Sequence, residues 1–215
     1  MRVNEPKSVL ITGCSSGIGR CTAEMLKARG YRVFASARRA EDVAELARAG
    51  FEAVQLDLSQ SDSIQAAVAS VLDQTGGTLY GLFNNGAYGQ PGAVEDLSLA
   101  ALKAQFETNF FGTHELTRLI IPVMRRQGYG RIIQNSSVLG FAAMKFRGAY
   151  NASKFALEGL TDTLRLELKG SGVWVSLIEP GPIESRFRDN ALKQYQAHVV
   201  PTGSPHETTY ARLVE

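Results

Sequence analysis

Residues 12–19 read TGCSSGIG, between an apolar run at 8–12 (SVLIT) and a stretch with helical spacing at 17–29. Glycines at such a strand-to-helix turn permit a tight bend and let a ligand phosphate approach the backbone. The free N–H groups and the positive dipole end of the following helix then face that phosphate. The spacing, G-x-x-x-G-x-G, differs from the usual G-x-G-x-x-G. The stretch therefore predicts a phosphate-binding turn, with an unliganded glycine-rich turn as the alternative.

Short apolar runs alternate with helical patterns along the rest of the chain. This alternation predicts right-handed βαβ crossovers and a parallel sheet, in a doubly wound α/β fold of Rossmann type. Pro122 should kink or break the fourth helical stretch. A further helix is expected at 186–199, and the polar tail from 201 carries no clear strand. The expected strands are 8–12, 32–37, 53–57, 80–84, 131–135 and 173–178, and the helical stretches are 17–29, 40–49, 61–74, 98–127 and 148–169.

Length and composition predict a single domain over residues 1–215. The net charge of +2 gives no strong field for nucleic acid or anionic lipid. Cys14 and Cys21 form neither a disulfide framework nor a metal cluster, so no metal site is expected. The sequence shows no membrane span and no signal-peptide pattern, and we expect a cytoplasmic protein.

Glycines, small polar residues or charged residues follow every expected strand, where an open parallel sheet binds its ligands. Arg38 follows the second strand, and residues 35–37 contain no carboxylate. An acidic residue there favours NAD, whereas an arginine accommodates the 2′-phosphate of NADP. The alternative is that Arg38 and Arg39 are a solvated basic pair. Trp174, in the sixth strand, is expected in the core.

Tyr150 and Lys154 are four residues apart on one expected helix, so both side chains share a face. A nearby cation lowers a tyrosine pKa and makes the phenol a usable acid and base. Ser137 ends the fifth strand and can hydrogen-bond the same carbonyl oxygen.

The same glycine loop also fits G-x-S-x-G, the nucleophile elbow of serine hydrolases, with Ser15 as nucleophile. Asp189 with His198 or His206 gives the hydrolase order of triad residues. However, only seven residues precede this first strand, which leaves no earlier loop for the oxyanion hole.

These motifs together resemble the short-chain dehydrogenase/reductase family, in its short single-domain branch. The chain is most similar to NADP-dependent aldehyde reductases and to hydroxysteroid and retinol dehydrogenases. The resemblance covers residues 7–187, and family members continue through a substrate lid and a last strand that this sequence lacks. It departs from the family pattern N-N-A-G at Asn84-Asn85-Gly86-Ala87, which either moves the free φ angle by one residue or is a tolerated variant, the interpretation that we favour. It rests on residues 12–19, Asn84, Asn85, Gly86, Asn109, Ser137, Tyr150, Lys154, Pro180 and Gly181.

The resemblance implies an NADP(H)-dependent oxidoreductase in which Tyr150 is the acid/base, Ser137 polarises the carbonyl, and Lys154 binds the nicotinamide ribose and lowers the Tyr150 pKa. Asn109 matches the asparagine that anchors a water chain to this lysine. Asp57 and Asn85 are implied to contact the adenosine, Ser16 and Arg38 the 2′-phosphate, and Ile183 and Ser185 the carboxamide and diphosphate. The full cofactor set is Gly13, Ser15, Ser16, Gly17, Ile18, Gly19, Arg38, Asp57, Leu58, Asn85, Gly86, Tyr150, Lys154, Pro180, Gly181, Ile183 and Ser185.

The substrate side of the expected cleft is apolar, which favours a hydrophobic aldehyde, ketone or alcohol over sugars and carboxylates. The alternative is that Phe141 and Phe146 pack against the sheet. The long helices at 98–127 and 148–169 resemble the pairing helices of the family and imply a homodimer or homotetramer. A cofactor-binding sensor or scaffold without catalysis remains an alternative function on the same fold. The expected lining residues are Tyr88, Leu139, Phe141, Met144, Phe146 and Phe187.

Overall fold

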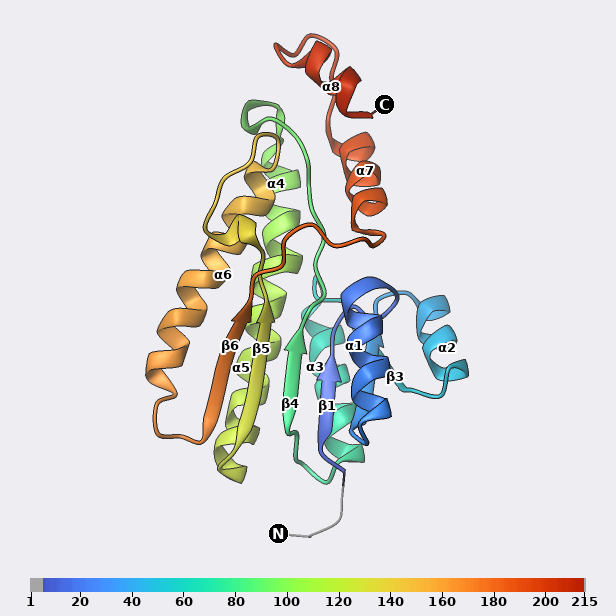
Figure 1. The fold of residues 1–215 in the computed structure, drawn as a ribbon, viewed down its shortest axis with the longest axis vertical. Coiled ribbons are helices and arrows are strands. Elements are labelled where there is room, and N and C mark those ends of the chain that lie inside the picture. Colours follow the sequence, from blue (N-terminus) through green and yellow to red (C-terminus); the bar gives the residue numbers. More distant parts are fainter. Residues whose placement is uncertain (1–5, 215) are drawn as a thin grey trace.

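The structure, a computed structural model, describes residues 6–214 and contains a six-stranded parallel sheet (Figure 1). The strand order is β3-β2-β1-β4-β5-β6, so the winding reverses between β1 and β4. This reversal opens a crevice at the carboxyl ends of the two strands. The parallel α/β prediction is confirmed. The strands are β1 (Ser8–Ile11), β2 (Arg32–Ala37), β3 (Glu52–Gln55), β4 (Gly81–Asn84), β5 (Gly130–Asn135) and β6 (Val173–Ile178).

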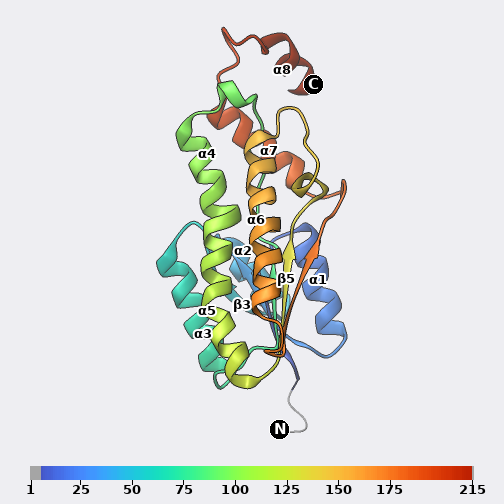
Figure 2. The same cartoon turned by 90° about the vertical axis from the view of Figure 1, so that its left-hand side faces the viewer.

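Helices cover both faces of the sheet. Two of them, α1 and α2, lie on one face, whereas α3, α5 and α6 lie on the other (Figures 1 and 2). Among the described residues, no helix is both long and apolar enough to cross a membrane. The helices are α1 (Gly17–Ala28), α2 (Ala40–Arg48), α3 (Ser61–Gln74), α4 (Leu99–Phe106), α5 (Gly112–Gln127), α6 (Gly148–Glu167), α7 (Phe187–His198) and α8 (Glu207–Val214), with short helical turns η1 (Val94–Asp96), η2 (Glu107–Phe111) and η3 (Val138–Gly140).

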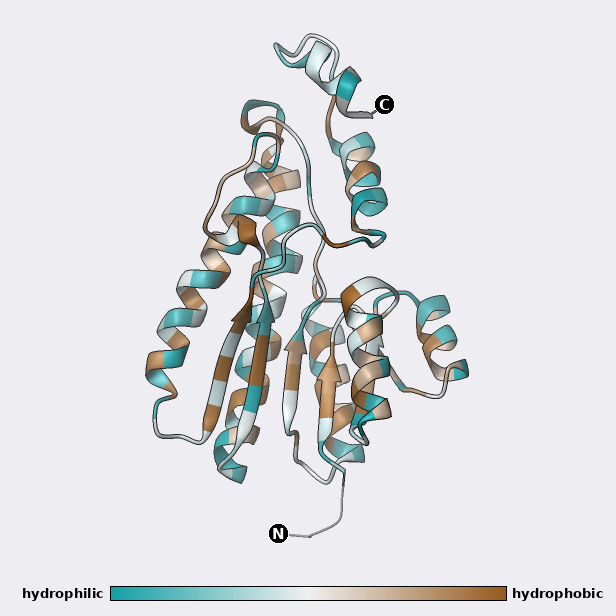
Figure 3. Cartoon of the chain, viewed as in Figure 1, coloured by the Kyte–Doolittle hydropathy of each residue, from teal (hydrophilic) through white to brown (hydrophobic). Residues whose placement is uncertain are grey.

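Two apolar cores sandwich the sheet. The larger core joins alternate strand residues such as Leu10 and Leu82 to α3 and α5, and the second joins Val9 and Ile11 to α1 and α2. Apolar strands alternate with mixed helices in the hydropathy view (Figure 3), as buried parallel strands require. Successive side chains of the strands thus hold a helical layer on each side.

The core prediction for Trp174 is wrong, since this side chain is 65% exposed. Val173 and Val175 point into the larger core, so Trp174 points to the opposite face of β6. In the described part of the chain no helix covers that face of this edge strand (Figure 1). The strand β6, whose side chains alternate between its two faces, therefore buries only one face.

The expected break at Pro122 is also wrong, because α5 continues through this residue. Hydrogen bonding changes earlier, at the π-helical turn η2 between α4 and α5. Such turns occur mostly at functional sites. Here η2 carries the buried Asn109, described below.

The polar tail forms a helix, α8, that the sequence analysis did not predict. Its Tyr210 is 1% exposed and packs with Tyr195 of α7. The Tyr210 hydroxyl donates to Asp96 Oδ2 over 2.6 Å and accepts from the Ala93 N–H over 2.7 Å. These bonds hold α7 and α8 above the carboxyl ends of the strands (Figure 1).

Gly112, the first residue of α5, lies against the backbone carbonyl of Leu58. A Cβ at Gly112 would overlap that carbonyl, whereas a Cβ at Gly159, in α6, would meet no atom within 4 Å. Both glycines have helical conformations, so the two positions differ in the room available for a Cβ and not in backbone strain.

We expect Gly112→Ala to lower the free energy of unfolding by about 1–3 kcal/mol, because a rigid backbone group must move. Gly159→Ala should instead raise it by about 0.5–1 kcal/mol, since alanine loses less entropy in a helix. Urea denaturation of both variants measures this difference. A Gly112→Ala protein as stable as the parent would contradict the close packing of α5 on Leu58.

Candidate active site

The glycine loop after β1 presents backbone N–H groups to a cleft of about 320 Å³. The loop needs its glycines because Gly13 has φ +71° and Gly17 has φ +58°. Ser16 precedes α1 in an extended conformation, and no side chain caps the helix. The first turn also contains no acidic residue. These features leave the start of α1 free to bind an anionic group.

Gly19 does not line the cleft but lies where α1 meets the loop, against the Gly13 carbonyl and the Asn85 side chain. Gly13 in turn lies against Gly86, at 2.8 Å from an ideal Gly13 Cβ to the Gly86 Cα. Gly86 does not have a positive φ, so the alternative in which the free φ angle moves by one residue is wrong. What matters at Gly86 is its closeness to Gly13.

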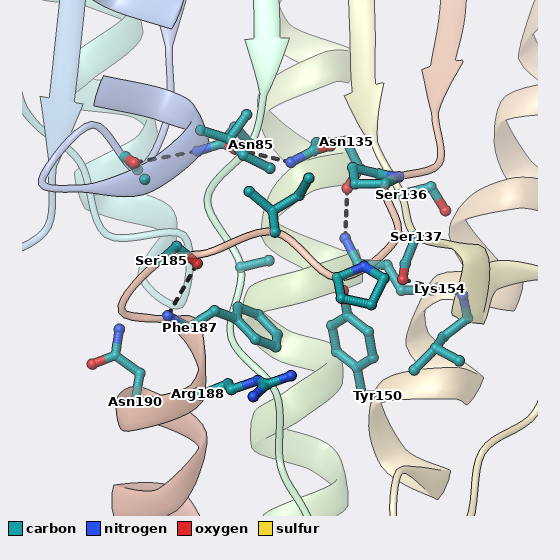
Figure 4. A pocket seen from close by; sticks show the side chains of 18 of the residues that line it. Asn85, Asn135, Ser136, Ser137, Tyr150, Lys154, Ser185, Phe187, Arg188 and Asn190 are labelled. Carbon is teal, nitrogen blue, oxygen red and sulfur yellow. Dashed lines mark hydrogen bonds between the residues drawn. The ribbon is translucent and has the colours of Figure 1, made fainter. Parts of the chain in front are cut away.

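A chain of side-chain contacts joins the ends of β1, β4 and β5 (Figure 4). The Asn85 amide donates to the carbonyls of Thr12 and Gly13 over 2.9 and 3.2 Å. The Asn135 amide donates to Asn85 Oδ1 over 2.9 Å, and the Asn135 carbonyl accepts from Lys154 Nζ over 2.6 Å. The three strand ends are thereby held in fixed relation around the cleft.

Lys154 is 2% exposed and points from α6 into the cleft. Burial lowers the pKa of its ammonium group to about 8, while the Glu158 carboxylate acts in the opposite direction. Asn135 is its only hydrogen-bond acceptor among the described residues. The ammonium group thus retains donors for a ligand.

Tyr150 and Ser137 line the cleft together beside this lysine. Tyr150 is 8% exposed, and Lys154 Nζ lies 5.6 Å from the centre of its ring. Burial raises the pKa of the Tyr150 phenol, and the hydrogen bond from Ser137 lowers it in part. The predicted lowering of this pKa by Lys154 is therefore not found in the protein alone, where burial dominates.

Asn109 lies behind these residues, outside the cleft lining, and is 1% exposed. Its amide donates to the Tyr88 carbonyl over 2.9 Å and to Ser153 Oγ over 3.3 Å, while its oxygen accepts from the Tyr88 N–H. The π turn directs Asn109 toward the chain that follows β4. In this structure Asn109 positions that backbone.

Arg38, Asp57 and Leu58 also lie outside the cleft lining. Arg38 is exposed at the end of β2, whereas Arg39 is paired with Asp42 over 2.8 Å. Asp57 accepts from the N–H and the hydroxyl of Ser59, which fixes the turn after β3. Leu58 is buried and lies beside Gly86.

The segment after β6 forms the opposite wall of the cleft, with Pro180, Gly181, Ile183 and Ser185 in the lining. Ser185 lies against Gly17 of the glycine loop. Two residues later, the Phe187 ring packs edge-on against Tyr150, with ring centres 5.5 Å apart (Figure 4). This wall therefore contacts both the phosphate-binding turn and the tyrosine.

The substrate side of the cleft differs from the prediction. Leu139, Met144 and Phe187 line it. Phe141 is 63% exposed and lies outside the lining, and Phe146 packs instead on Tyr210, with ring centres 5.5 Å apart. Phe146 adopts φ +60°, which turns the chain away from the cleft. Tyr88 is also absent from the lining.

Several lining residues were missed in the sequence. Asn135 and Ser136 end β5, so their place at a strand end was a usable signal. Arg188 gave no such signal because α7 places it, and it adds a charge to a side of the cleft that was expected to be apolar, with charge only through the neighbouring Lys145 and Arg147. The lining residues absent from the prediction are Asn135, Ser136, Pro182, Arg188 and Asn190, with Ala87 and Val138.

The hydrolase alternative lacks a base. Ser15 lines the cleft, but no histidine does so. Of the two candidate histidines, His206 precedes α8 and is bonded to Glu95 over 2.8 Å, and His198 ends α7 in an exposed position. Ser15 thus has no partner to activate it as a nucleophile.

The comparisons with known proteins agree with this geometry. A family model described as short chain dehydrogenase matches residues 7–196. The chain is 49% identical over 184 residues to YbbO of Escherichia coli, an uncharacterized oxidoreductase, covering 86% of this chain and 68% of that protein. It is 36% identical over 217 residues to retinol dehydrogenase 8 of Bos taurus, covering 96% of this chain and 69% of the other. The chain thus spans about two thirds of these relatives' length.

Solved structures share the fold. A short-chain dehydrogenase from Streptomyces avermitilis superposes with a TM-score of 0.80 at 36% identity, covering 84% of this chain and 66% of that one. A Burkholderia phymatum family member in complex with NAD gives 0.84 at 28% identity, covering 98% and 78%. A metagenomic oxidoreductase in complex with NADP gives 0.75 at 34%, covering 82% and 83%. With a matching family model, these relatives and the cleft described above, the chain belongs to the short-chain dehydrogenase family of oxidoreductases.

Proposed function

We propose that the protein is an NADP(H)-dependent enzyme that interconverts hydrophobic aldehydes or ketones and their alcohols. The observation that carries this proposal is the placement of Tyr150 and Ser137 together with a buried lysine in the same cleft as the glycine loop. A hydroxyl pair beside a cation can hold a carbonyl oxygen and supply its proton.

The cleft fits a nicotinamide dinucleotide on features of this structure. The uncapped start of α1 offers N–H groups for a diphosphate, and the positive φ of Gly17 permits the turn that exposes them. Asn135 Oδ1 and Ser136 Oγ are buried and have no hydrogen-bond partner among the described residues, so two residues of the cleft wall retain unused hydrogen-bonding atoms. When bound, the cofactor supplies or accepts the hydride.

In the proposed reduction, Tyr150 donates its proton to the carbonyl oxygen as the carbon gains a hydride, so an alcohol forms. Burial raises the Tyr150 pKa, which keeps the phenol protonated near neutral pH and ready to act as an acid. Ser137 holds the same oxygen, and Lys154 binds the nicotinamide ribose through its remaining donors. Asn109 acts as a positioning residue behind this group.

The preference for NADP(H) rests on Arg38. This side chain is exposed at the end of β2, where the adenosine ribose binds in this fold, and among the described residues it forms no ion pair. Ser16 lies in the neighbouring loop, and we propose that the two hold the 2′-phosphate. Related structures contain NAD in one case and NADP in another, so the argument depends on this chain's own residues.

A cofactor-binding sensor without turnover is the alternative function. It has no use for a proton donor, and the buried arrangement of Tyr150, Ser137 and Lys154 therefore favours an enzyme. Turnover of carbonyl compounds by the full-length protein distinguishes the two functions.

We also propose a homodimer or homotetramer that pairs through the α4–α5 and α6 faces. Apolar side chains are exposed there, including Phe111 at 50%, Phe155 at 47% and Leu166 at 76%. A symmetric interface buries such side chains against their copies.

Replacement of Tyr150 tests the proposed chemistry. Tyr150→Phe retains the ring but removes the proton donor, so we expect kcat to fall by about 10²–10⁴-fold. NADPH affinity should change little. Tyr129→Phe, on the opposite end of the sheet, is the matched control and should retain full activity. Steady-state kinetics and NADPH titration measure both, and full turnover by Tyr150→Phe would refute the mechanism.

Cofactor choice is tested at Arg38. Arg38→Ala should reduce the ratio of kcat/KM for NADPH to that for NADH by about tenfold or more, because charge-assisted hydrogen bonds to a phosphate are lost. Arg39→Ala is the control, since Arg39 is already paired with Asp42. Equal efficiency with the two cofactors in the parent protein would overturn the NADP assignment.

Assembly is tested by sedimentation velocity at micromolar concentration. We expect a dimer or tetramer, and a change of Phe155→Ser and Leu166→Ser should shift the protein toward the monomer because exposed apolar area is lost. A monomeric parent protein would contradict the proposed pairing.

A further inference from the structure

The cleft carries positive charge at its substrate end. Among its lining residues are two cations, Lys154 and Arg188, and no aspartate or glutamate. Lys154 is engaged with Asn135, whereas Arg188 stands at the start of α7. Its side chain extends past Phe187 toward the ring of Tyr150 (Figure 4). The charge of Arg188 is therefore presented beside the proposed reaction centre.

A second guanidinium group lies near the first. Arg147 precedes α6, one turn before Tyr150, and its backbone forms a bridge with Gly92 that fixes its position. The Arg147 side chain is half-buried and has one long hydrogen bond, 3.5 Å, to the Phe146 carbonyl. Burial lowers the Arg147 pKa, and the charge of Arg188 lowers it further.

No carboxylate compensates these two charges. Within residues 6–214, no ion pair includes Arg147 or Arg188. A half-buried cation with a like-charged neighbour costs free energy, and an anion between the two would recover it. The two arginines thus form a site that suits an anionic group.

The cofactor phosphates do not account for this site. The phosphate-binding turn faces Ser185 on one side of the segment after β6, whereas Arg188 faces Tyr150 on the other. Arg147 belongs to the loop that holds the substrate side of the cleft. The anion is therefore expected to belong to the substrate.

We infer that Arg147 and Arg188 bind a carboxylate or phosphate group of the substrate. This inference rests on the proposed function and narrows its substrate class. Leu139, Met144 and Phe187 line the same cleft as Arg188 and suit a hydrocarbon segment. The substrate is thus an amphiphilic carbonyl compound with an anionic end, for which two planar guanidinium groups give directional hydrogen bonds.

Matched substrates test this inference with the full chain and NADPH. A series of aliphatic ω-oxo carboxylic acids of increasing length is compared with the corresponding methyl esters, which lack the charge. In the parent protein, kcat/KM for the best acid should exceed that for its ester by about 10- to 100-fold. An ω-oxo alkyl phosphate series then distinguishes the two anions.

The acid-to-ester ratio is measured again in Arg147→Gln and Arg188→Gln, where it should fall toward one. Arg126→Gln, an exposed change in the last turn of α5, is the control and should keep the parent ratio. A ratio near one in the parent, or a high ratio that persists in both variants, would overturn the inference. If neither acids nor esters are reduced, the proposed function fails instead.

Binding measurements distinguish a failure of the anion-site inference from a failure of the proposed function. Saturated fatty acids and their methyl esters contain no reducible carbonyl and can be titrated calorimetrically into the protein with NADP⁺. The acids should bind at least about tenfold more tightly than the esters, and Arg188→Gln should remove the difference. Equal binding of acids and esters would refute the anion site. Thermal unfolding adds a further readout: Arg188→Gln should not lower the midpoint of unfolding, because no ion pair is lost.

Discussion

The close approach of Gly13 to Gly86 is the constraint on which the cleft depends. It brings the ends of β1 and β4 together at the point where the sheet reverses its winding. A Cβ at Gly13 would push the two turns apart because it meets the Gly86 backbone, whereas a Cβ at Gly86 would press on Leu58 and Thr12. Asn85 then bonds to the loop carbonyls and to Asn135, which carries this spacing across to β5 and Lys154. Loop, amide network and lysine thus form one unit whose parts cannot move independently.

Much of this arrangement could be predicted from the sequence, because strand periodicity and strand-end residues fix which groups meet at the carboxyl edge. Gly13, Ser137, Tyr150 and Lys154 line the cleft as expected. The errors concern features that depend on what packs against an element. Trp174 is exposed because the neighbour of β6 decides its burial, and Phe146 leaves the cleft because α8 provides its partner, Tyr210. Arg188 was missed for the same reason, since nothing in a polar helix indicates which way it will dock.

The electrostatics of the cleft separate into two regions. Lys154 is buried with an acceptor and near Glu158, so its charge is partly supported by the protein. Arg147 and Arg188 have no carboxylate partner within the described residues. Tyr150 lies between these regions, and its raised pKa reflects burial more than either cation. A ligand that brings negative charge to both regions therefore improves the electrostatics of the whole cleft, and the protein alone is in its less favourable state.

The bond between Tyr210 and Ala93 joins residues 117 positions apart in the chain. Contacts of such long range form slowly, because the entropy cost of closing a large loop must be met before the contact can stabilise the chain. The sheet and its helices rely on nearer neighbours and can assemble first. During synthesis, the wall that carries Phe146 and Arg147 therefore gains its support only after α8 has left the ribosome. The substrate side of the cleft thus gains this support later than the sheet forms.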